Sequence, residues 1–221
     1  MGKTGARTRA LDTLLTQVGR PPTRPRPPAP RLARMPPEAA ENVEALYVAL
    51  GGRRGAPALG PRGWDLLAGE TLVELDEEQH FNRYRATTLQ TDWAEQLPWT
   101  TPYQGWCATE EDACLKAAAR QGFWTTPTST AQFGPSAPRK DIDAPDGAAR
   151  WKQRALYDAM RDSAALAGVL GYRLARLSVH DSIDGTRLND ILTGRFLTGR
   201  TPNLEAFVAL LDARTLTPSS S

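Results

Sequence analysis

The segment from residue 71 to residue 81, Thr-Leu-Val-Glu-Leu-Asp-Glu-Glu-Gln-His-Phe, constrains the fold of this chain more than any other. It begins as a β-strand, in which successive side chains leave opposite faces. Glu74 and Asp76 therefore share one face, while Val73 and Leu75 give the other face an apolar surface to bury. Neighbouring carboxylates repel each other unless a cation or a proton lies between them. The segment predicts a strand with one buried face and one charged face.

A third acid precedes this strand. The residues from 64 to 71 read Trp-Asp-Leu-Leu-Ala-Gly-Glu-Thr, which is typical of a short strand, a glycine turn and the return into the next strand. Such a hairpin would bring Asp65 close to Glu74 or Asp76. Three carboxylates at one end of a hairpin indicate a site for a hard divalent cation.

Composition excludes several classes of protein. A chain of 221 residues can build one sizeable domain with an appendage. Cys107 and Cys114 are too few for a disulfide framework, and neither has the spacing of a zinc site. No apolar run approaches the roughly 20 residues of a membrane span, and the N-terminus lacks a secretory hydrophobic region. We therefore predict a cytoplasmic protein that does not associate with membranes.

Charge is concentrated at the N-terminus. Residues 1–37 contain eight basic residues and one acid, a charge of +7, which leaves −5 on the rest of a chain whose total is +2. Eight of the 18 prolines fall between Pro21 and Pro37. This composition predicts a mostly disordered basic arm, with at most a short helix from Ala10 to Val18. The arm could attract nucleic acid non-specifically, or it could be only a solubilising tail.

The rest of the chain predicts an α/β domain over residues 38–180. Strands are expected at 62–67, 71–78 and 172–178, and helices at 39–50, 109–122 and 148–170. Residues 86–147 read as an irregular insertion that contains a long loop at 123–147. Its tryptophans could stack on bases or pack onto the core. Two short helices are expected within residues 181–213, followed by a disordered tail at 214–221.

The order of these motifs resembles the PD-(D/E)XK nuclease superfamily, and within it the very-short-patch-repair (Vsr-like) endonuclease branch and its bacterial relatives. Those proteins carry an Asp on one strand and a Glu-x-Asp-Gly-x-x-His segment on the next, which here reads Glu74-Leu-Asp-Glu-Glu-Gln-His80. Their third segment is matched by Tyr157-Asp-Ala-Met-Arg-Asp162, then Leu166, then Gly171-Tyr-Arg-Leu-Ala-Arg176. Glu77 stands where the relatives usually have Gly. The resemblance covers about residues 38–180.

This resemblance implies a restriction-endonuclease-like α/β core, a central mixed sheet flanked by helices, that cuts DNA with Mg²⁺ or Mn²⁺. It implies that Asp65 and Glu74 hold the cation, with Asp76 as a further ligand. It also implies that His80 donates a proton to the leaving oxygen or orients the phosphate. The family's glutamate on the first helix falls on Glu44.

Basic residues complete the implied site. The superfamily's usual lysine, two residues after the second acid, is replaced here by Asp76, and Lys152 could supply the missing charge. We expect the nucleic-acid contacts to come from two residues of the long helix and two that follow His80: Lys152, Arg161, Arg83 and Arg85.

Three functions remain open from the sequence: a metal-dependent DNA endonuclease, a catalytically inactive nucleic-acid-binding scaffold on the same fold, and a regulatory or interaction protein without a nucleic-acid role. The complete set of acids favours the first. The charge of −5 on the body favours the third, because DNA-binding domains are usually basic.

Overall fold

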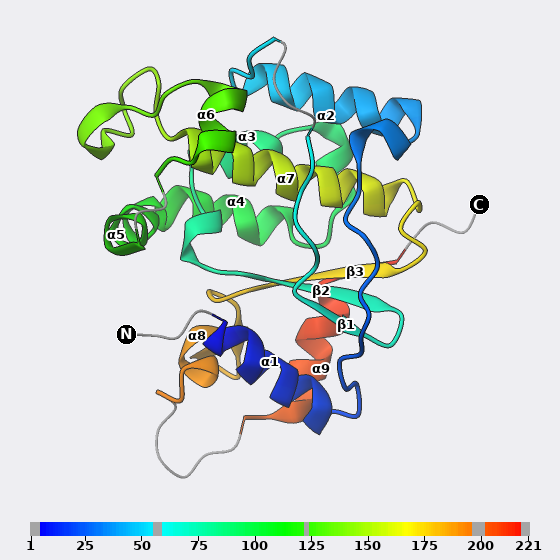
Figure 1. The fold of residues 1–221 in the computed structure, drawn as a ribbon. Coiled ribbons are helices and arrows are strands. Elements are labelled where there is room, and N and C mark those ends of the chain that lie inside the picture. The colour runs from blue at the N-terminus through cyan, green and yellow to red at the C-terminus, as the bar shows by residue number, and fades with distance from the viewer. Residues whose placement is uncertain (1–4, 55–58, 122–123, 196–201, 218–221) are drawn as a thin grey trace. The chain divides into compact units, whose positions relative to one another are not determined.

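The computed structural model describes residues 5–54, 59–121, 124–195 and 202–217. The protein is α/β, with helices and a mixed four-stranded sheet (Figure 1). Its chain divides into two compact units, which we describe one at a time. The first unit comprises Met1–Pro28, Gly63–Glu77 and Gly171–Ser221, and the second comprises Ala29–Arg62 and Glu78–Leu170.

The first unit contains the sheet, in the strand order β1-β2-β3-β6. β1 (Leu66–Ala68) and β2 (Thr71–Asp76) form an antiparallel hairpin, and Gly69 in its turn has a φ of 58°, which favours glycine. β2 pairs in parallel with β3 (Arg173–Ser178), and β3 pairs antiparallel with β6 (Thr215–Leu216). The strands expected at 62–67, 71–78 and 172–178 therefore lie in one sheet, although the first is observed at Leu66–Ala68.

One face of this sheet is covered by helices of the first unit. Val73 and Leu75 of β2 and Leu177 of β3 lie in an apolar core with residues of α1 (Ala6–Gln17), α8 (Leu188–Leu192) and α9 (Leu204–Ala213). Figure 1 shows these three helices on the same side of the sheet. α8 and α9 are the two short helices expected near the C-terminus. A two-stranded ribbon, β4 (Ser182–Ile183) and β5 (Thr186–Arg187), precedes α8.

The basic N-terminal arm is ordered where the structure describes it, so the prediction of disorder was wrong there. Leu11, Leu14 and Leu15 of α1 are buried in the core of the first unit. The chain then follows the edge of β1, where Pro22 bridges Ala68 and the N–H of Thr23 donates to the carbonyl of Leu67 (2.7 Å). Composition alone predicts that this segment is unfolded. It is ordered because three leucines at helical spacing pack into the core and because the chain bonds to the free edge of β1. The expected tail begins with β6, and residues 218–221 lie outside the described part of the chain.

The second unit is helical and is built around α7 (Ala149–Leu166), which corresponds to the helix expected at 148–170. α7 contacts α2 (Pro37–Ala49), α3 (Arg83–Thr88) and α6 (Pro127–Phe133). Leu156, Ala159 and Met160 of α7 pack with Val43 and Leu46 of α2. The helix ends earlier than predicted, and Gly168 beyond it has a φ of 68°.

The predicted irregular insertion at 86–147 is mostly helical, so that expectation was also wrong. Besides α6 it contains η3 (Asp92–Gln96), α4 (Thr100–Thr109), α5 (Glu111–Gln121) and η4 (Pro138–Lys140), while η1 (Leu32–Arg34) and η2 (Glu78–His80) lie outside it. A capping box between Thr126 and Ser129, with Pro127 in the first turn, begins α6 inside the expected loop. Trp99 is fully buried, and Trp106 packs edge-on against Phe81. These tryptophans therefore pack the core.

No helix in the described residues is long and apolar enough to cross a membrane.

Candidate functional site

Two of the three predicted metal-binding acids meet at one end of the β1–β2 hairpin. Asp65 immediately precedes β1, and its backbone N–H donates to Oε1 of Glu74 (3.0 Å). In return, the N–H of Leu75 donates to Oδ2 of Asp65 (3.0 Å). Glu74 is buried and Asp65 is partly exposed. The reciprocal bonds hold both carboxylates in place, and carboxylate oxygens are the ligands that Mg²⁺ prefers, so the donor set fits such an ion.

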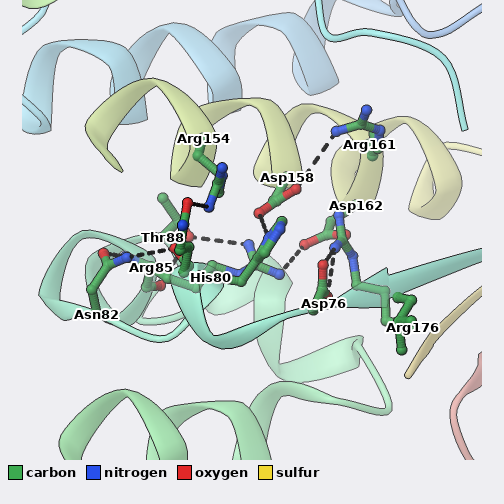
Figure 2. Close-up of polar contacts among 12 residues, drawn as sticks. Asp76, His80, Asn82, Arg85, Thr88, Arg154, Asp158, Arg161, Asp162 and Arg176 are labelled. Atoms are coloured by element: carbon green, nitrogen blue, oxygen red, sulfur yellow. Dashed lines mark hydrogen bonds and ion pairs between the residues drawn. The ribbon is translucent and has the colours of Figure 1, made fainter. Parts of the chain in front are cut away.

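The third acid, Asp76, binds an arginine of the neighbouring strand. Both oxygens of Asp76 accept from Nη1 of Arg176, at 2.9 and 2.8 Å (Figure 2). The side chains of Asp76 and Arg176 are 2% and 0% exposed, so the charge of Asp76 is balanced inside the protein. Glu74 and Asp76 share a face of β2, as the alternation predicts, but Asp76 is paired with Arg176.

His80 lies in the second unit, at the end of η2, and is paired with α7. Its Nδ1 lies 2.7 Å from Oδ2 of Asp158, and the side chains are 19% and 2% exposed (Figure 2). An aspartate on Nδ1 fixes the orientation and tautomer of an imidazole, so that Nε2 is the nitrogen that can exchange a proton with a substrate. His80 and Asp158 also offer one metal-ligand atom each, an imidazole nitrogen and a carboxylate oxygen.

Asp158 belongs to a row of polar side chains on one face of α7. Nη1 of Arg154 donates to Oε1 of Gln79 (2.8 Å), and Oδ2 of Asp162 accepts from Nη2 of Arg85 (2.7 Å). The side chain of Asn82 caps α3 by accepting from the N–H groups of Tyr84 and Arg85. This cap fixes the start of the helix that carries Arg85. Figure 2 shows this row facing η2 and α3. The row therefore bonds to Gln79, which precedes His80, and to Arg85, which follows it, and so holds the segment that carries His80.

The predicted nucleic-acid-binding residues are all engaged within the second unit. Arg85 is 1% exposed and pairs with Asp162, while Arg83 pairs with Glu111 and Asp143, each at 2.7 Å. Hydrogen bonds to Glu111 raise the pKa of Arg83.

Lys152 and Arg161, the two predicted nucleic-acid-binding residues of α7, are also buried. Nζ of Lys152 lies 5.5 Å from the ring centre of Tyr84, and burial lowers the pKa of this lysine. Nη2 of Arg161 donates to the carbonyl of Arg62 (2.9 Å), and Nη1 lies 3.5 Å from Asp158. Glu44, the predicted glutamate of the first helix, is exposed on α2.

Sequence reasoning did not find two partners of the predicted residues. Asp158 was given no role of its own, although the Tyr157 to Asp162 motif already placed it in the resemblance. Arg176 is the last residue of the other matched motif, and pairing of β2 with β3 would have pointed to it. The cysteines add no candidate nucleophile, because both are buried and burial raises the pKa of Cys114 to about 12.

Comparison with known proteins places the chain in a family. Residues 45–194 match a model described as a family of unknown function (DUF7255), so the protein belongs to that family. No curated protein and no solved structure matches the chain.

Proposed function

We propose that this protein is a metal-dependent endonuclease that hydrolyses phosphodiesters in DNA. The observation that carries the proposal is the pair of carboxylates, Asp65 and Glu74, held by reciprocal hydrogen bonds at one end of a β-hairpin. Placing two acids together costs electrostatic energy, and a divalent cation would repay it. The resemblance of the surrounding motifs to Vsr-like nucleases supports the same conclusion.

Asp65 and Glu74 would hold the ion, which we propose to be Mg²⁺ or Mn²⁺. When bound, the ion would polarise the scissile phosphate and activate water. Asp76 would act through a water molecule, since both of its oxygens accept from Arg176. Arg176 would balance the charge of Asp76 and hold its carboxylate in place on β2.

His80 would transfer the proton. Its Nδ1 is bonded to Asp158, so Nε2 would donate to the leaving oxygen or orient the phosphate. Asp158 would act as a positioning residue because it sets the orientation of the ring. This arrangement is typical of a histidine that acts as a general acid.

The proposal is tested with purified protein and supercoiled plasmid DNA. Cleavage should require Mg²⁺ or Mn²⁺, and EDTA should abolish it. Asp65→Asn removes a metal-binding charge while keeping the size of the side chain, so cleavage should fall by at least roughly 10²-fold. Glu70→Gln is the matched control, because it removes an exposed carboxylate from the turn of the same hairpin. Calorimetry should show Mn²⁺ binding to the wild type and to Glu70→Gln only. Wild-type protein without metal-dependent cleavage and without metal binding would refute the proposal.

A second candidate is a catalytically inactive nucleic-acid-binding protein on the same scaffold. The observation that favours it is the buried Asp76–Arg176 pair, which neutralises one of the three acids without a metal. In that case DNA would bind equally well in EDTA and in Mg²⁺, and it would remain uncut.

A further inference from the structure

The ordered part of the basic arm brings two arginines to the hairpin that carries Asp65. The N–H of Thr23 donates to the carbonyl of Leu67, and three residues later Nη1 of Arg26 donates to the carbonyl of Trp64 (2.7 Å). The arm therefore runs beside β1 toward the residue that precedes Asp65. All of these residues belong to the first unit.

A cavity of about 280 Å³ lies where the arm meets the hairpin. Its lining consists of Arg24, Pro25, Arg26 and Pro27 from the arm, and Gly63 and Trp64 from the hairpin. Among the described residues of this lining, the charged groups are the two guanidinium groups. Their charge and planar donors favour an oxyanion such as a phosphate over an uncharged ligand.

The arginines of this cavity differ from the predicted nucleic-acid-binding residues. Arg83, Arg85 and Arg161 each pair with an acid. Within the described ranges, no acidic side chain pairs with Arg24 or Arg26. Arg26 uses one donor on Trp64, and a guanidinium has five N–H donors in all, so several remain for a ligand.

The backbone of the arm favours binding by these arginines. Pro25 and Pro27 alternate with them, and proline restricts φ to a narrow range. A pre-ordered segment loses less conformational entropy when a ligand binds. The hydrogen bonds to Leu67 and Trp64 add to this order.

We propose that Arg24 and Arg26 form a phosphate-binding site for the nucleic-acid backbone. The inference rests on the proposed function, because Trp64 in the cavity wall directly precedes Asp65. A phosphate bound here would be a neighbour of the scissile one and would place the strand against the proposed metal site. Phosphate contacts of this kind set position and affinity without reading sequence.

The test measures binding alone, so that it does not depend on cleavage. Anisotropy of a labelled DNA duplex is recorded in EDTA over a series of salt concentrations. Arg24→Gln/Arg26→Gln should weaken binding and reduce the slope of log K against log salt by about 1 to 2. The matched control is Arg9→Gln/Arg20→Gln, which removes the same charge from the same arm outside the cavity. It should change the slope by less than half as much.

Arg24→Gln alone guards against a folding defect, because this side chain is exposed and has no hydrogen bond to the hairpin in the described part of the chain. It should retain the wild-type melting temperature and reduce the slope by about 1. Inorganic phosphate is titrated in parallel by calorimetry. Phosphate binding as tight as that of the duplex would identify a free phosphate as the ligand and overturn the nucleic-acid assignment.

Two other outcomes would overturn the inference: equal effects of the cavity and control variants, or no duplex binding by the wild type. The endonuclease proposal fails separately. If cleavage is absent but the cavity variants still lower the salt slope, the phosphate site stands and the metal site falls.

Discussion

The contact between His80 and Asp158 allows the proposed proton transfer to be tested by single substitutions. His80→Ala should lower the cleavage rate by about 10²-fold or more, as expected for loss of a general acid. Asp158→Asn should lower the rate less and change its dependence on pH, because an amide no longer fixes the tautomer of the ring. Single-turnover rates across pH measure both effects, with the exposed Asp146→Asn as control. A pH profile unchanged in Asp158→Asn would exclude a positioning role.

Lys152 allows a test of how the burial of a single charged residue affects the stability of the protein. Burial lowers the pKa of Lys152 below its usual 10.5 in the folded protein. Below that lowered pKa both states carry the charge, and the folded state bears the full desolvation cost. As pH rises from the lowered pKa to 10.5, the folded state loses its proton first, so this residue makes the free energy of unfolding increase with pH.

We therefore expect Lys152→Met to flatten the rise of stability at pH values below 10.5, where only the folded state has lost the proton. Urea denaturation at several pH values measures the slope. Lys116→Met, at an exposed position of α5, is the control and should leave the slope unchanged. Equal slopes in wild type and Lys152→Met would show that the lysine does not bear this cost.

At the scale of elements, α1 belongs to a segment that its composition predicts to be disordered, yet its leucines lie in the core of the first unit. Leu15→Ala should lower the free energy of unfolding by about 2 to 5 kcal/mol, because Leu15 is fully buried against the sheet of the first unit. Thr13→Ala, on the exposed side of the same helix, should change it by less than about 0.5 kcal/mol. Chemical denaturation measures both. A small effect of Leu15→Ala would mean that α1 is not docked in solution.

The strands and helices also differ in how far the sequence predicted them. β2 was predicted because its alternation of apolar and charged residues is a local signal. α3, α4 and α6 were missed because polar residues and prolines interrupt their apolar pattern. The first turns of α3 and α6 are supported by the caps Asn82 and Thr126, which hydrogen-bond geometry identifies.

For the molecule as a whole, the metal proposal predicts a change in stability. At about 100 times its dissociation constant, Mg²⁺ should stabilise the folded protein by about 2.7 kcal/mol and raise the melting temperature by roughly 5 to 10 °C. Asp65→Asn should abolish the increase. Without metal this variant should melt at or slightly above the wild-type temperature, because repulsion with Glu74 is relieved. Calorimetric scans in Mg²⁺, in EDTA and in a monovalent salt of equal ionic strength provide the measurement. An equal increase in the monovalent salt would indicate screening instead of binding.

The sequence by itself determined the features that depend on neighbours along the chain. The period of two in residues 71–76 put Glu74 and Asp76 on one face, and the glycine turn brought Asp65 to Glu74. Spacing of apolar residues predicted α1, α2, α7 and the terminal helices. These features follow from backbone geometry that acts over a few residues.

Tertiary structure alone decided which side chains meet across the chain. Arg176 pairs with Asp76 over 100 residues, and Asp158 pairs with His80 over 78. The first pair depends on the register of β2 and β3, and the second on the rotation of α7 about its axis. Docking of the basic arm onto β1 likewise depends on a strand edge far away in sequence. No local pattern encodes these alignments, because each is set by the packing of whole elements and by the need to pair buried charges.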